Sequence, residues 1–146
     1  MGKRRRAREL TLQFLYQYDA MNESSADSQA LEKSISFFWD ENGLNVDSEV
    51  KEFSSVLIKG CCVNLGHLDE IIVRYSKNWR LSRISNIDKN ILRIALYEML
   101  YLSDIPPAVT INEAVELGKT FGTEESGSFV NGILDKIKED LEKGDL

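Results

Sequence analysis

The chain has 146 residues, 42% of them hydrophobic and 29% charged, which is typical of a globular protein with a real core and argues against a disordered chain. No apolar run approaches the roughly 18 residues that a membrane-spanning helix needs. The basic N-terminus is not followed by a long apolar segment, so we expect a cytoplasmic protein. Cys61 and Cys62 are adjacent and His67 is the only histidine, so we expect no disulfide framework, no metal site and no cofactor.

Charge is distributed unevenly along the chain. The formal net charge is −6, yet the first eight residues carry five positive charges and no acid. One concentrated basic end on an acidic chain can hold a phosphate backbone at a single place while the remainder repels nucleic acid. A basic terminus without any partner is the alternative, and charge alone does not decide between the two.

The first predicted helix covers residues 3–20. Its apolar residues recur at the helical period and centre near Ala7 and Phe14. At about 100° per residue, Tyr16 and Arg5 then share the opposite side, within roughly 20° of each other. Such a pair suits single-stranded RNA, because the guanidinium binds phosphate and the ring stacks on an unpaired base. The alternative is that Tyr16 packs under a neighbouring helix.

The middle of the chain predicts further helices separated by polar or glycine-containing breaks. A loop is expected over 22–27 and a helix over 28–41. Asp47-Ser48 then caps a long helix, which we expect Gly66 to break before another helix over 67–76.

The segment 87–102 is apolar on nearly all sides, so we expect it to run through the middle of the molecule. Pro106-Pro107 ends any helix before it. Thr110 and Glu113 match a capping box at the start of the next helix. That helix is expected to end at Gly122 in the left-handed conformation.

The last predicted helix is capped by Thr123. Glu124 and Glu125 would lie in its first turn, where the helix dipole favours acids. Phe129 lies roughly 90° from the centre of its apolar face, so this ring either covers the core edge or stacks on a base. No segment shows the two-residue alternation of a strand. The predicted fold class is all-α, a compact helical bundle of about seven helices.

Catalytic motifs are lacking. Gly118-Lys119-Thr120 resembles the end of a phosphate-binding loop, but the position that should hold the first glycine is Glu113, and the context is helical. The paired carboxylates are of the kind common on helix surfaces, and no nucleophile motif accompanies the histidine. We therefore expect no enzymatic activity.

Four stretches, in order over essentially the whole chain, resemble the NusB family of bacterial transcription antitermination factors. They are KRRRARE at 3–9 with LY at 15–16, NILRIALYEM at 90–99, INEAVEL at 111–117, and FVNGILDK at 129–136. The resemblance is weakest over about 20–50. It implies two small helical subdomains, about 1–78 and about 79–146, without catalytic activity.

The resemblance also implies partners and site residues. NusB proteins bind boxA-type single-stranded RNA together with NusE, which is also a ribosomal protein, in an antitermination complex with RNA polymerase that supports ribosomal RNA transcription. The positions that match the family's RNA surface are Arg4, Arg5, Arg6, Arg8, Tyr16 and Phe129, with Glu125 as an acid that tempers affinity and His67 where some relatives have tyrosine. The expected NusE contacts are Trp79, Leu81, Arg93 and Tyr97.

Other functions stay open at this stage. NusB-like domains also occur fused to RNA methyltransferases, although this chain has no glycine-rich strand region for S-adenosylmethionine. A protein–protein adaptor with incidental arginines is a further alternative. A homodimer formed through the basic helix would hide the RNA surface, which is a hypothesis about regulation.

Overall fold

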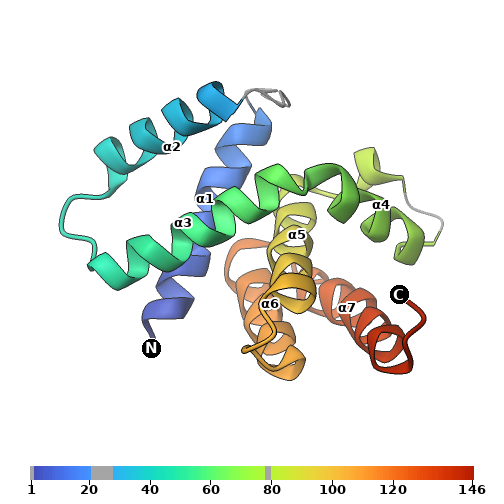
Figure 1. The fold of residues 1–146 in the computed structure, drawn as a ribbon. Helices are drawn as coiled ribbons and strands as arrows, with labels where there is room; N and C mark the ends of the chain where they lie inside the picture. The colour runs from blue at the N-terminus through green and yellow to red at the C-terminus, as the bar shows by residue number, and fades with distance from the viewer. Residues whose placement is uncertain (1, 21–27, 78–79) are drawn as a thin grey trace. The chain divides into compact units, whose positions relative to one another are not determined.

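The computed structural model describes residues 2–20, 28–77 and 80–146. These residues form seven α-helices and one short 3₁₀ helix, and none of them lies in a strand, which confirms the all-α fold class (Figure 1). The chain divides into two compact units, Met1–Val63 and Asn64–Leu146. We expected a division near residue 78. The second unit begins earlier because α4 (Leu65–Tyr75) packs against later helices of the chain.

The first unit contains α1 (Lys3–Ala20), α2 (Ser28–Asn42) and α3 (Ser48–Val63), and α3 packs across α1 (Figure 1). The predicted buried face of α1 is confirmed, since Ala7 and Phe14 are both buried. Leu12 is buried as well, although it lies outside that predicted face. The loop expected over 22–27 falls outside the described residues.

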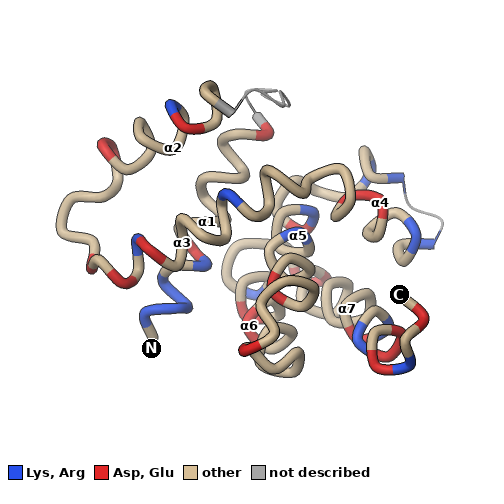
Figure 2. Tube along the Cα trace, viewed as in Figure 1, with Lys and Arg blue, Asp and Glu red and all other residues tan. Residues whose placement is uncertain are grey.

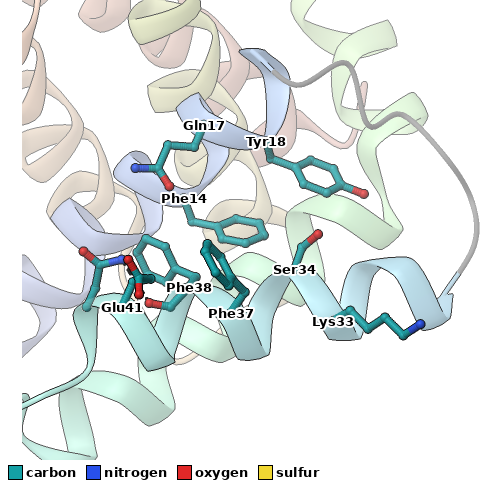
Figure 3. Close-up of a pocket in the computed structure, with 9 residues that line it drawn as sticks. Phe14, Gln17, Tyr18, Lys33, Ser34, Phe37, Phe38 and Glu41 are labelled. Carbon is teal, nitrogen blue, oxygen red and sulfur yellow. Dashed lines mark hydrogen bonds between the residues drawn. The ribbon is translucent and has the colours of Figure 1, made fainter.

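An aromatic cluster joins α1 to α2. The Phe14 ring stacks on Tyr18 and meets Phe38 edge-on, with a centroid distance of 5.4 Å in both pairs. Beside them lies a pocket of about 460 Å³ that is lined by residues of the two helices, and Figure 3 shows Phe14 and the exposed Phe37 within it. These rings account for the packing of α2 on α1.

The break that we predicted at Gly66 is wrong by two residues. α3 ends at Val63, and the chain restarts as α4 at Leu65, with Asn64 between them at φ −104° and ψ 16°. Asparagine suits this place because its short polar side chain competes with the helical backbone. Gly66 lies in the first turn of α4. The cap predicted for α3 is confirmed, since Asp47 Oδ1 accepts a 2.8 Å hydrogen bond from the Glu49 N–H.

The second unit is built on α5 (Asn86–Tyr101), which packs against α4, α6 (Pro107–Phe121) and α7 (Ser126–Lys143). A 3₁₀ helix, Leu81–Arg83, precedes it. Every residue from Asn90 to Leu96 is buried, so α5 forms the core of this unit as its composition predicts.

The start of α6 differs from the predicted capping box. The helix begins at Pro107, whose fixed φ and missing N–H suit the first helical position. Thr110 is therefore inside the helix, and its Oγ1 donates a buried 2.8 Å hydrogen bond to Glu98 Oε1 of α5. Thr110 therefore does not cap α6 but links α6 to α5 by a side-chain hydrogen bond.

The junction of α6 and α7 corrects three predictions. The N-cap residue of α7 is Glu125 and not Thr123. Gly122 has φ −97° and so is not left-handed; a side chain there would collide with Ser126. α7 begins at Ser126, so Glu124 and Glu125 lie in the turn before it rather than in its first turn. The Ser126 Oγ accepts a 2.9 Å hydrogen bond from the Thr123 N–H and closes that turn.

The structure also places the glycine of the apparent phosphate-loop motif and the two cysteines. Gly118 lies inside α6, where a Cβ would come within 3.2 Å of the Gly127 nitrogen of α7, so it allows close helix packing. The apparent phosphate-loop motif is therefore part of a helix interior, as expected. Cys61 is buried and Cys62 is half-buried, and neither forms a disulfide bond.

Candidate nucleic-acid interface

A cluster of basic residues lies at the N-terminal end of α1 (Figure 2). Arg4 and Arg6 are exposed and Arg5 is half-buried. Arg6 also pairs with Glu9 of the same helix, at 3.2 Å between Nη1 and Oε1. Because these cations lie within the first two turns of one rigid helix, they can face a phosphate backbone together.

Arg8 is buried, although the family resemblance places it at the RNA surface. Its side chain is only 4% exposed, and its guanidinium lies 5.6 Å from the centre of the Phe53 ring of α3. Arg4 lies over the same ring at 4.5 Å. A cation over an aromatic face keeps its charge and its edge N–H groups. Phe53 therefore orients two arginines without neutralising them.

Lys3 is held by carboxylates. Its Nζ lies 3.1 Å from Glu49 Oε1 and 3.4 Å from Asp47 Oδ2, both at the start of α3. The hydrogen bond to Glu49, followed by the charge of Asp47, raises the pKa of Lys3. The Glu49 N–H lowers the pKa of Asp47, and Lys3 lowers it further. The sequence alone does not reveal this contact, because 44 or more residues separate its partners along the chain.

Tyr16 is 45% exposed, so no neighbouring helix covers its ring. It shares a face of α1 with Arg5, three turns earlier, by helical geometry. On the other side of the helix, the Thr11 hydroxyl lies 2.8 Å from the Ser54 hydroxyl of α3 and is fully buried. α1 is thereby fixed to α3 while the stripe of Arg5 and Tyr16 stays accessible.

The second unit carries the other residues that we expected at an RNA surface. Glu125 and Phe129 lie close together, since the Phe129 N–H donates a 2.9 Å hydrogen bond to the Glu125 carbonyl. Glu125 is exposed, and Phe129 is half-buried. His67 is exposed on a different helix, α4. Here the Glu125 carboxylate could oppose RNA binding by repelling phosphate, while the Phe129 ring one turn away could support it by stacking on a base.

The expected partner residues have very different surroundings. Leu81 and Tyr97 are half-buried, and Trp79 lies outside the described residues. Arg93 is 4% exposed and binds Asp69 of α4 through two hydrogen bonds of 2.7 and 2.8 Å. Direct contact with a partner is therefore easier for Leu81 and Tyr97 than for Arg93.

An exposed ring near the end of α5 was missed as a surface candidate. Tyr101 is accessible to solvent and stacks on Tyr97 at 5.1 Å. The spacing of four residues puts both rings on one side of the helix, which is the signal that could have identified the pair. The sequence obscures the pair, because Tyr101 stands in a run of apolar residues from Met99 to Leu102.

Within the described parts of the chain, no group of three or more His, Cys, Asp or Glu residues is placed to hold a metal ion. The helices in those same parts are too short or too polar to span a bilayer.

Comparison with known proteins gives a consistent result. Residues 5–139 match the profile of the NusB family. A transcription antitermination protein NusB from Thermodesulfovibrio yellowstonii is 46% identical over 143 residues, covering 95% of this chain and 94% of that protein. The solved NusB of T. maritima is 37% identical, with a TM-score of 0.82 over 100% of this chain and 99% of that one.

A further solved structure contains antitermination factors NusB and NusE in complex with double-stranded RNA. Its matching chain is 23% identical to this one, with a TM-score of 0.80 over 95% of this chain and 98% of that chain. At this identity the likeness concerns the fold alone.

Proposed function

Because this chain belongs to the NusB family, we propose that it is a transcription antitermination factor that binds boxA-type single-stranded RNA through α1 and has no catalytic activity. The observation that carries this proposal is the arrangement of α1. Its first two turns hold five cations, and Tyr16 is exposed on the side that carries Arg5. Phosphate binding needs the cations, and an unpaired base needs the ring.

In this proposal the arginines of α1 have two different roles. Arg4, Arg5 and Arg6 contact phosphate, and Tyr16 stacks on a base. Arg8 is nearly buried, so its main contribution is a positive charge held close beneath the surface and the orientation that it shares with Arg4 on Phe53.

The second unit adds weaker determinants. Phe129 supplies a second stacking ring, and Glu125 lowers the affinity because its carboxylate repels phosphate. His67 is accessible enough to stack as well. Since the acid and the Phe129 ring lie one turn apart, replacing Glu125 with glutamine should strengthen RNA binding without loss of stacking.

NusE is the proposed protein partner, in an antitermination complex with RNA polymerase that acts in the cytoplasm on ribosomal RNA transcription. Support comes from the relatives named as antitermination proteins and from the similar fold solved with NusE and RNA. We propose that Trp79, Leu81 and Tyr97 contact NusE. Arg93 acts indirectly, by holding α4 against α5.

Fluorescence anisotropy with a short labelled boxA-like RNA, with and without NusE, tests the proposal. Replacing Arg5 and Arg6 with glutamine should lower the affinity and reduce the salt slope by about 0.7 for each lost phosphate contact. Lys143→Gln, at the far end of α7, is a control with the same charge change per residue. A duplex of the same sequence distinguishes single-stranded from double-stranded recognition. Absence of RNA binding even with NusE would leave the adaptor as the function.

We also propose that self-association through α1 competes with RNA. Mass measured by light scattering should rise with protein concentration and fall when RNA is added. A mass that stays monomeric at every concentration would contradict this part of the proposal alone.

A further inference from the structure

We propose that Asp47 and Glu49, at the start of α3, set the RNA affinity of α1 by holding Lys3 away from phosphate. We call these two residues the acidic clamp. The inference rests on the proposed function of α1 and adds to it a competitor for the RNA within the same unit.

The geometry of the clamp favours competition over permanent closure. Lys3 Nζ lies 3.1 Å from Glu49 Oε1 and 3.4 Å from Asp47 Oδ2. The side chains of Lys3, Asp47 and Glu49 are 55%, 46% and 73% exposed. An ion pair this exposed to water is weak. A phosphate group, which also offers anionic oxygens to the ammonium, can therefore displace it.

Tertiary structure holds the two sides of the contact in place. Asp47 accepts the Glu49 N–H with Oδ1 as the cap of α3, which leaves Oδ2 directed at Lys3. α1 is fixed against α3 by the buried Thr11–Ser54 contact at 2.8 Å. Lys3 therefore meets the acidic clamp whenever the first unit is folded.

The clamp differs from the contacts that Phe53 of α3 makes with two arginines of the basic stretch. Phe53 receives Arg4 and Arg8 on its ring and leaves their charges intact. The carboxylates oppose the charge of Lys3 directly. α3 thus orients two cations for binding and withholds a third.

The test compares variants with equal changes of charge. Asp47→Asn keeps a good helix cap, and Glu49→Gln keeps the shape of the side chain. Glu52→Gln is the control, because Glu52 is an exposed acid one turn further along α3 for which the described structure records no ion pair. Circular dichroism checks that each variant retains its helical content.

RNA affinity of the full chain, measured by anisotropy across a salt series, is the readout. The Asp47→Asn/Glu49→Gln variant should bind RNA up to about fivefold more tightly at low salt, because Lys3 no longer has to leave an exposed ion pair to meet phosphate. This gain should shrink as the salt concentration rises. In a Lys3→Gln background the same two substitutions should have no such effect, because no ammonium remains to be released.

Each other result overturns the inference. Equal gains for Glu49→Gln and Glu52→Gln would mean that only net charge matters, and a gain that persists without Lys3 would mean that the clamp acts on something else. In both cases the RNA-binding role of Arg5 and Arg6 would stand. If the unaltered protein binds no RNA with or without NusE, the proposed function and the acidic clamp both fail.

Discussion

Replacing Asp69 with asparagine removes the negative charge opposite Arg93 inside the second unit. Arg93 is 4% exposed, and its guanidinium pairs with the Asp69 carboxylate through Nε–Oδ1 at 2.7 Å and Nη2–Oδ2 at 2.8 Å. Nη1 meanwhile donates to the amide oxygen of Asn90 at 2.8 Å. The substitution therefore leaves the buried guanidinium with polar partners but without the negative charge of the Asp69 carboxylate.

The expected cost follows from that geometry. Removing one partner of a buried ion pair costs about 3–5 kcal/mol, and the 19% exposure of the Asp69 side chain favours the lower end. For about 3 kcal/mol in a chain of this size we expect the melting temperature to fall by roughly 6–12 °C. Urea unfolding followed by circular dichroism measures the free energy directly.

Two further variants separate charge from packing. Asp69→Asn/Arg93→Met removes both charges and should recover most of the loss, because a buried pair is often replaceable by apolar groups. Glu142→Gln breaks the exposed pair with Lys138, 3.5 Å apart, and should cost at most about 0.5 kcal/mol. If Asp69→Asn costs no more than Glu142→Gln, the assignment of Arg93 to a structural role is refuted.

Four other variants each test a single position. Phe53→Leu should weaken RNA binding severalfold with little change in helicity, because the two stacked arginines lose their ring; unchanged affinity in the anisotropy assay would count against that role. Tyr75→Phe removes a 2.5 Å hydrogen bond to Asp140 and should cost about 1 kcal/mol in urea unfolding. That hydrogen bond raises the pKa of Tyr75, so its stabilisation is full below the ordinary value of 10.0 and is lost as pH rises through the raised value; the variant should lack this alkaline loss. Gly118→Ala should destabilise by about 1–3 kcal/mol, because the new Cβ lies 3.2 Å from a backbone nitrogen of α7. Gly132→Ala, where nothing lies within 4 Å, should instead stabilise the exposed helix by about 0.5–1 kcal/mol in the same assay.

Much of the fold could be predicted from the sequence, because a helix depends on residues three and four apart. The buried face of α1 around Ala7 and Phe14 and the apolar α5 both follow from that short period. The family is also readable from ordered local motifs. Two predicted helix boundaries were wrong because another residue nearby has a stronger preference for the boundary position. The polar Asn64 separates α3 from α4 in place of Gly66, and the rigid Pro107 begins α6 in place of a cap at Thr110.

Helical periodicity predicts only part of the candidate interface. Tyr16 and Arg5 share a stripe by helical geometry alone, and Tyr16 is indeed exposed. Whether each cation is buried, stacked or paired with an acid depends on tertiary contacts. Arg8 is buried by tertiary packing, with its guanidinium over Phe53, and Lys3 meets acids more than forty residues away.

By itself, then, the sequence determined the helices, the family and the presence of a basic end. Tertiary structure decided which cations are oriented, which is withheld and which is structural, as with Arg93 on Asp69. The physical reason is the distance along the chain over which each effect acts. Helical periodicity acts within a few residues, whereas the charge and burial of a side chain depend on whatever the folded chain brings within a few ångströms of it.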